Sequence, residues 1–284
     1  MPEITSDMVR RLRERTGAGL MECKKALAEA AGDEEAAIDW LRKQGLKTAE
    51  KKSAREMGEG RIATWIAPKS RIGALVALTC ETDFVANTAD FNDLLGALVH
   101  SVADRNPAST EALLDLQHPQ TGVSLGESIK LFVGKLGENT QVARMQRYEN
   151  MQGRVGTYVH HDKKKAALVS VTTGADEDVA APFLKELCMH IVSKVPAPLS
   201  ISREEIPAAE VERERAIYVE EVKGKPAEMV EKIVKGKLDK FFADVVLPEQ
   251  KWVFDDSKTV AKVVEERLGA GSKIAGFTHV RIGK

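Results

Sequence analysis

The residues best suited to act on another molecule are Thr82, Asp83, Phe84 and Val85, which follow an apolar run at residues 72–79. A run so rich in valine, leucine and alanine is typical of a buried strand. An acid and a phenylalanine therefore stand side by side where a strand ends. Burying a phenylalanine is worth roughly 1.5–3 kcal/mol, so Phe84 either packs into the core of the chain or contacts a partner.

Catalytic chemistry has little support in the sequence. Asp83 as a general acid would need a second carboxylate, and Glu81 is expected to point to the other face. No nucleophile elbow or phosphate-binding glycine loop occurs. The adjacent His160 and His161 are expected to face opposite ways, as neighbouring strand residues do, and so not to share a metal. We therefore predict a protein that is not an enzyme and needs no cofactor or metal.

The cysteines and the chain's hydropathy indicate a compartment. Cys23, Cys80 and Cys188 lie far apart without a C-x-x-C pair, so we expect buried free thiols in a reducing environment. The first residues lack the basic and apolar regions of a signal peptide. No apolar run of about 18 residues, the length a membrane span requires, is present. These features predict a cytoplasmic protein.

The charges of the chain nearly cancel. Its 42 basic and 43 acidic residues leave a formal net charge of −1. A protein that binds nucleic acid usually has a basic excess, so we expect no direct contact with nucleic acid. The run Lys163-Lys164-Lys165 is expected to be a solvated turn.

The elements that must position these residues begin with three short helices. Apolar spacing predicts helices at residues 5–15 and 20–30, and a third that begins after Asp33. Gly45 is expected to end this third helix as its C-cap. The charged stretch at 47–57 then reads as a linker that is helical at least in part. Together these segments predict a compact helical bundle.

The rest of the chain contains an internal repeat. Two apolar segments recur at the same offset of 93 residues, and each pair leads into a predicted helix. Two strands in one register at both places predict a duplicated core of strands and helices. The matching segments are residues 60–65 with 153–158 and residues 74–79 with 167–172, and the predicted helices are 89–102 and 179–195.

A second, weaker match shows that the later copy is longer. Residues 136–143 correspond to 268–275 at an offset of 132, so about 39 extra residues lie between Val195 and Lys258. Apolar spacing there predicts two antiparallel helices, near 208–222 and 230–245, joined by a short turn. Such a hairpin cannot bury both faces on itself, so it could pack on its own copy in a dimer or on a partner.

The repeat also isolates Phe84. At the first offset, Asp83 corresponds to Asp176, but Phe84 corresponds to Glu177. If Phe84 only closed the core of its copy, the sister position would be expected to be apolar. Because an unpaired glutamate is rarely buried, the comparison favours Phe84 as a contact to a partner.

Three segments resemble one known family closely. Residues 13–27, Gly32-Asp33 and residues 82–87 are similar to bacterial elongation factor Ts, and the resemblance runs the length of the chain. It implies an α+β fold of four parts, with an inserted antiparallel helical hairpin, or coiled coil. These parts are a UBA-like (ubiquitin-associated-like) three-helix bundle with its linker at 1–55, two similar core subdomains at 56–149 and at 150–202 with 247–284, and the hairpin at 203–246.

The resemblance also implies a function in translation. Members of the family are guanine-nucleotide exchange factors for elongation factor Tu, which they bind in its GDP-bound and nucleotide-free forms. By this resemblance, residues 82–85 approach the partner's magnesium site and promote GDP release. Arg13, Leu20 and Met21 of the bundle and His160 of the second core subdomain match positions that contact the partner.

The sequence allows more than one role for Asp83, for the hairpin and for the chain as a whole. Asp83 could orient backbone donors of the partner or draw a partner side chain away from the magnesium shell. The hairpin could form a dimer. An alternative function is a non-catalytic UBA-type adaptor, in which the bundle binds peptides and the core is a scaffold.

Overall fold

The chain combines helices and β-sheets in an α+β fold. A computed structural model describes residues 4–283 and divides them into two compact units. The first unit contains the described residues up to Ala63, Leu75–Gln146 and the end of the chain from Ile282; the second contains Thr64–Ala74 and Arg147–Arg281.

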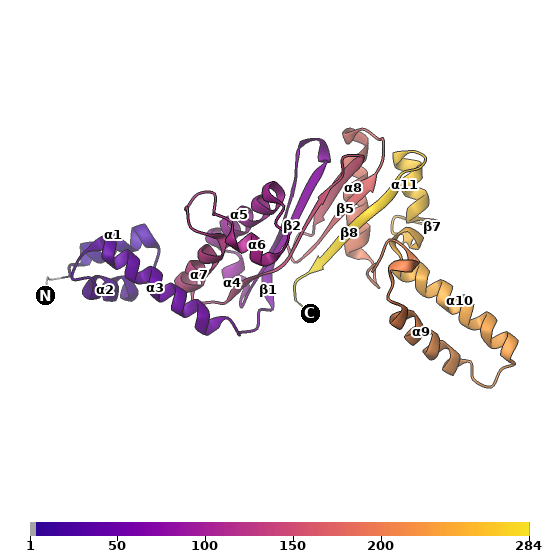
Figure 1. The fold of residues 1–284 in the computed structure, drawn as a ribbon, viewed down its shortest axis with the longest axis horizontal. Coiled ribbons are helices and arrows are strands. Elements are labelled where there is room, and N and C mark those ends of the chain that lie inside the picture. Colours follow the sequence, from indigo (N-terminus) through magenta and orange to yellow (C-terminus); the bar gives the residue numbers. More distant parts are fainter. Residues whose placement is uncertain (1–3, 284) are drawn as a thin grey trace. The chain divides into compact units, whose positions relative to one another are not determined.

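Three helices open the first unit (Figure 1). They are α1 (Ser6–Thr16), α2 (Leu20–Glu29) and α3 (Glu34–Lys52). The side chains of Thr5 and Asp33 cap α1 and α3 by accepting hydrogen bonds from backbone N–H groups of the first turn. The predicted helices are confirmed, and they enclose a small core that includes Leu12, Cys23, Ala26, Leu27 and Ala37.

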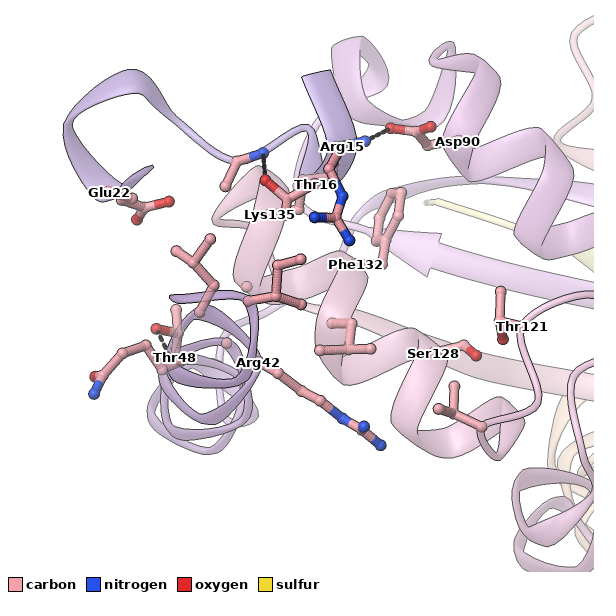
Figure 2. A pocket seen from close by; sticks show the side chains of 18 of the residues that line it. Arg15, Thr16, Glu22, Arg42, Thr48, Asp90, Thr121, Ser128, Phe132 and Lys135 are labelled. Atoms are coloured by element: carbon pink, nitrogen blue, oxygen red, sulfur yellow. Dashed lines mark hydrogen bonds and ion pairs between the residues drawn. The ribbon is translucent and has the colours of Figure 1, made fainter. Parts of the chain in front are cut away.

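The expected end of α3 at Gly45 is wrong, because the helix continues to Lys52. Gly45 packs against Gly134 of α7 (Leu125–Leu136), and a methyl group added to Gly134 would overlap the Cα of Gly45. The glycine therefore serves a close approach of two helices and not a turn. Side chains of the same two helices, including Arg42 and Phe132, line one pocket (Figure 2).

Residues 59–149 form a three-stranded sheet, in the order β1-β2-β3, and several helices. The elements are β1 (Glu59–Ile66), β2 (Ile72–Cys80), α4 (Asp83–Ala86), α5 (Ala89–Arg105), α6 (Thr110–Asp115), α7 and β3 (Thr140–Glu149). The strand β2 and the helix α5 lie where the apolar pattern predicts them, and part of each strand belongs to the second unit. The rings of Phe91 and Phe132 join α5 to α7, edge to face, with centroids 5.9 Å apart.

The second unit contains a second three-stranded sheet. Its strands are β4 (Gly153–Val159), β5 (Lys165–Thr172) and β8 (Lys273–Arg281), with β5 in the centre and antiparallel to both neighbours. The first two strands lie where the repeat predicts them. The helix α8 (Glu177–Ser193) follows β5, again as predicted, and α11 (Val260–Leu268) precedes β8.

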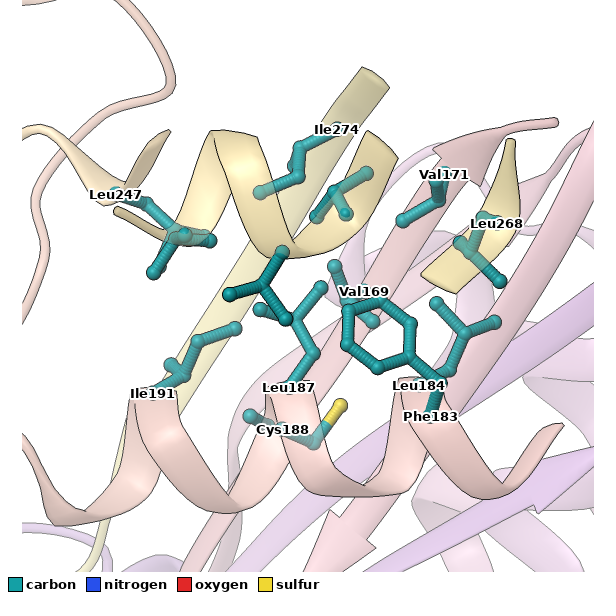
Figure 3. Packing of buried hydrophobic residues seen from close by; sticks show 14 of the residues in the cluster. Val169, Val171, Phe183, Leu184, Leu187, Cys188, Ile191, Leu247, Leu268 and Ile274 are labelled. Atoms are coloured by element: carbon teal, nitrogen blue, oxygen red, sulfur yellow. The ribbon is translucent and has the colours of Figure 1, made fainter. Parts of the chain in front are cut away.

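The core of the second unit lies between α8, the sheet and α11 (Figure 3). Phe183, Leu184, Leu187 and Cys188 project from α8 into it and are almost completely buried. A side chain at Gly156 of β4 would overlap Leu184, so glycine at that point lets α8 approach the strand closely.

Two helices, α9 (Ala208–Glu221) and α10 (Ala227–Val245), contact each other as a hairpin within the second unit (Figure 1). Lys237 of α10 pairs with Glu221 and lies over the ring of Tyr218. Short elements precede and follow the hairpin in the chain. They are the 3₁₀ turns Arg203–Glu205 and Leu247–Glu249, and the strands β6 (Lys251–Trp252) and β7 (Asp255–Thr259). None of the helices in residues 4–283 is long and apolar enough to cross a membrane.

Candidate functional site

Phe84 lies on a single helical turn, α4, that directs its ring into solvent. Thr82 caps the turn, because its hydroxyl accepts a hydrogen bond from the Val85 N–H at 3.4 Å. Val85 and Ala86 are buried, whereas Phe84 is 82% exposed. The turn is therefore anchored on one face and presents an aromatic ring on the other, so Phe84 is not a core residue.

The other predicted residues of this turn differ in what they can contact. Asp83 is exposed beside Phe84. Val85, predicted to act on the partner, is buried, so its side chain anchors the turn and does not reach a partner directly. Glu81 accepts a hydrogen bond from the Asn139 N–H at 2.7 Å and pairs with Arg55 at 3.4 Å. Glu81 is thus engaged with its own chain and forms no acid–base pair with Asp83.

The cysteine before the turn is chemically inert. The Cys80 thiol donates to the carbonyl oxygen of Thr82 at 3.1 Å. Burial of the thiol, together with a smaller contribution from the negative charge of the nearby Glu138 carboxylate, raises the pKa of Cys80 to about 12. Burial also raises the pKa of Cys23 and Cys188, and all three cysteines are free and buried as expected. At neutral pH these thiols stay protonated and serve as packing groups.

The three predicted contact residues of the bundle are on its surface. Leu20 and Met21 begin α2 and are 54% and 72% exposed, and Arg13 of α1 is also exposed. They lie outside the bundle core because Cys23 and Leu27 occupy the inward face of α2. Seven of the eight predicted site residues thus belong to the first unit; the eighth, His160, belongs to the second.

A pocket of about 680 Å³ lies between the bundle helices and α5 and α7 (Figure 2). Several of its charged groups have partners within the unit. Lys135 pairs with Asp90 at 2.7 Å, Arg15 pairs with Glu34 at 2.8 Å, and Lys25 lies over the ring of Trp40. These pairs join the elements that form the walls of the pocket.

His160 follows β4, which ends at Val159, and its Nδ1 lies 3.1 Å from the hydroxyl of Tyr158. The expectation that His160 and His161 face opposite ways is wrong, because their ring centroids are 4.2 Å apart. Both residues lie in the turn, where the alternation of a strand no longer holds. Among the described residues, no group of three or more potential ligands could hold a metal ion.

His160 lines a cavity of about 560 Å³ in the second unit that the sequence did not reveal. Its rim is apolar: Val195, Val253 and Phe254 are 92%, 44% and 56% exposed. Cationic and imidazole groups also line the cavity, and its lining residues within the described chain include no aspartate or glutamate. These groups are Lys165, Lys194, Arg281, His160 and His279.

A buried histidine supports this rim. His190 is fully buried and stacks on Trp252, with ring centroids 5.1 Å apart. Its Nδ1 accepts from the Val253 N–H at 3.1 Å, so the ring is neutral and Nε2 donates to Gln250 at 2.9 Å. Burial lowers the pKa of His190 to about 4. In the sequence, the apolar run Trp252-Val253-Phe254 was the only hint of this rim. His190, which supports it, lies about sixty residues earlier.

Comparison with known proteins shows the family of the chain. The family model "Elongation factor TS" matches residues 81–284. The chain is 41% identical to elongation factor Ts of Symbiobacterium thermophilum, an alignment that covers 100% of this chain and 93% of the relative. It is 35% identical to the Magnetococcus marinus protein, over 99% of this chain and 93% of the relative, and 38% identical to the Desulfovibrio desulfuricans protein, over 99% of both.

The family model covers most of the chain, and these relatives align with nearly all of it at more than a third identity. The chain therefore belongs to the elongation factor Ts family.

Proposed function

We propose that the chain is the guanine-nucleotide exchange factor of elongation factor Tu and that Phe84 opens the partner's nucleotide site. A GTPase holds its nucleotide through backbone amides, a lysine and a magnesium ion that bridges the phosphates. The observation that carries the proposal is the 82% exposure of Phe84 on a turn whose other face is buried. An aromatic ring in that position can enter between two elements of a partner.

The mechanism needs binding energy and no chemistry or cofactor of the chain's own. An exchange factor must bind the nucleotide-free partner more tightly than the GDP-bound partner, and this coupling is reciprocal. Accelerating release a thousandfold requires about 4 kcal/mol of differential binding. A single aromatic hot spot can supply about 2 kcal/mol or more, so Phe84 provides a large part and other contacts the rest.

Asp83 acts beside the ring in one of two ways. Its exposed carboxylate either orients backbone N–H groups of the partner or draws a cationic side chain away from the magnesium shell. Either action weakens the hold on magnesium and phosphate, which are the groups that retain GDP.

Two further surfaces supply affinity. In the bundle these are Arg13, Leu20 and Met21, whose side chains are exposed without a role in its core. In the second unit, His160 lies at the cavity rimmed by Val253 and Phe254. A surface that combines apolar side chains with cationic ones suits a partner face that combines apolar with acidic residues.

The finer architecture is part of the proposal. We infer a UBA-like bundle with its linker at 1–55, a duplicated core at 56–149 and at 150–202 with 247–284, and a coiled-coil insertion at 203–246. The helix–strand pairs α7–β3 and α11–β8 support the duplication, because each closes one copy. We infer that the hairpin can form a dimer, and the exposed apolar side chains of Ile217, Val219 and Met229 support this. The proposed partner places the chain in the cytoplasm.

Release of labelled GDP from purified elongation factor Tu tests the function. The chain should raise the release rate in proportion to its concentration until the partner is saturated. A UBA-type adaptor would bind without changing that rate. An unchanged rate in the presence of a demonstrated complex would therefore overturn the exchange function and favour the adaptor.

A further inference from the structure

One carboxylate fixes the start of the turn that carries Phe84. Glu138 lies in the loop after α7, and it accepts two hydrogen bonds from Thr82. Oε2 accepts from the Thr82 backbone N–H at 3.0 Å, and Oε1 accepts from its hydroxyl at 2.7 Å. That hydroxyl in turn accepts from the Val85 N–H. A charged group therefore holds both the backbone and the side chain of the residue that caps α4.

A second charged group holds the other end of the same turn. Arg61 is buried and donates to the Asn87 side-chain oxygen at 2.6 Å. The Asn87 N–H closes the turn by donating to the Asp83 carbonyl at 3.0 Å. A helix of four residues has no stability of its own, because nucleation costs more than one turn of hydrogen bonds returns. The turn therefore depends on these contacts at its two ends.

The loop that supplies Glu138 also contacts the segment after α3. The next residue, Asn139, donates from its side chain to the carbonyl oxygens of Ser53 and Arg55 at 3.1 and 3.0 Å. Its backbone N–H donates to Glu81, one residue before Thr82. Two adjacent residues thus tie the Phe84 turn to the chain that leaves the bundle, so the loop itself is firmly held.

We propose that Glu138 is a positioning residue for Phe84 in nucleotide exchange, acting through Thr82. The inference rests on the proposed function. The Phe84 ring can separate two elements of a partner only if the turn that carries it stays folded on contact. A turn that melted on contact would relax instead of transmitting binding energy, whereas a preorganised turn delivers that energy to the partner. Glu138 itself needs no contact with the partner for this role.

The test compares Glu138→Ala with Glu138→Gln in the full chain. The alanine variant loses both bonds to Thr82, and we expect its maximal rate of GDP release to fall about tenfold. The concentration of variant that gives half the maximal rate should stay within about twofold, because the surfaces that supply affinity are intact. In Glu138→Gln the amide oxygen can accept from the N–H and the amide nitrogen can donate to the hydroxyl. This variant should retain most of the maximal rate.

The controls separate positioning from general damage. Asp104→Ala removes an exposed carboxylate from α5 and should leave both kinetic parameters unchanged. Circular dichroism and thermal unfolding check that each variant folds. Should Glu138→Ala not fold, Glu138→Asp takes its place; its carboxylate is too short to reach both donors, and the maximal rate should again fall.

Phe84→Ala is measured in parallel. If Phe84→Ala slows release but folded Glu138→Ala or Glu138→Asp does not, the positioning role is overturned and the exchange mechanism stands. A fall in affinity with an unchanged maximal rate also overturns it. If none of these variants, Phe84→Ala included, slows release, the proposed action of Phe84 is wrong and the role of Glu138 is overturned with it.

Discussion

At the scale of single residues, the chain uses two phenylalanines of one unit for different purposes. Phe91 is completely buried against α7, whereas Phe84, seven positions earlier, is 82% exposed. The repeat predicted an exposed Phe84, because its sister position is Glu177. In the structure Glu177 is half-buried and accepts a hydrogen bond from Ser70 at 2.7 Å. The exposed ring therefore has no structural role that its sister position shares.

Unfolding measurements should separate the two rings. Phe84→Ala should change the free energy of unfolding by less than about 0.5 kcal/mol, as surface substitutions usually do. Phe91→Ala, the matched control in the same unit, should lower it by about 3–5 kcal/mol because it leaves a cavity. Urea denaturation of both variants checks this. A large loss for Phe84→Ala would show that its ring supports the fold.

His190 should make the stability of the protein depend on acid. Its folded-state pKa of about 4 lies below the usual value of 6.5, so the unfolded chain takes up the proton first. The stabilisation is complete above pH 6.5 and is lost as the pH falls towards 4, by roughly 3 kcal/mol in total. Urea denaturation across this range should show a stability gap between wild type and His190→Gln that narrows as the pH falls. A gap for His190→Gln that stays constant across this pH range would contradict the proposed role of His190.

At the scale of elements, close packing of α3 on α7 explains the glycine at position 45. A glycine in a helical pattern commonly marks a C-cap, but Gly45 meets Gly134 of α7, about ninety residues later. The local sequence around Gly45 does not reveal this contact with α7, so the helix was predicted to end at Gly45. Glycine here permits the two backbones to approach, and α3 continues to Lys52.

Gly134→Ala should therefore destabilise the protein, by about 1–3 kcal/mol, because its methyl group would overlap the Gly45 backbone. The matched control is Gly96→Ala in α5, where an added methyl group would meet no atom within 4 Å. There the better helix propensity of alanine should stabilise by about 0.5–1 kcal/mol. Thermal unfolding should show a lower melting temperature than wild type for Gly134→Ala and a higher one for Gly96→Ala. Equal effects would show that the helix contact does not limit the residue at Gly134.

At the scale of the whole molecule, the sequence was most informative where a pattern repeats or is local. The offset of 93 residues predicted β4, β5 and α8, and apolar spacing predicted α9 and α10. The cavity beside His160 could not be found in this way, because its groups come from segments as distant as Lys165 and Arg281. The hydrogen bond from the Val253 N–H to His190 likewise joins residues that are distant in the sequence and meet only in the folded chain.

Binding should draw on surfaces of more than one element. Met21→Ala should weaken the complex with elongation factor Tu about tenfold without loss of stability, since the side chain is 72% exposed. Calorimetry measures the affinity. Met151, which is 68% exposed and is not a predicted contact, provides the matched control. Equal affinities for Met21→Ala and wild type would remove Met21 from the proposed interface.

The most direct test of the central claim is the rate of GDP release from elongation factor Tu at saturating concentrations of wild type and Phe84→Ala. We expect the folded variant still to bind elongation factor Tu, but GDP to leave the complex at least about tenfold more slowly than with wild type, because an aromatic hot spot is lost. If folded Phe84→Ala promotes GDP release from elongation factor Tu at the wild-type rate, Phe84 does not open the nucleotide site.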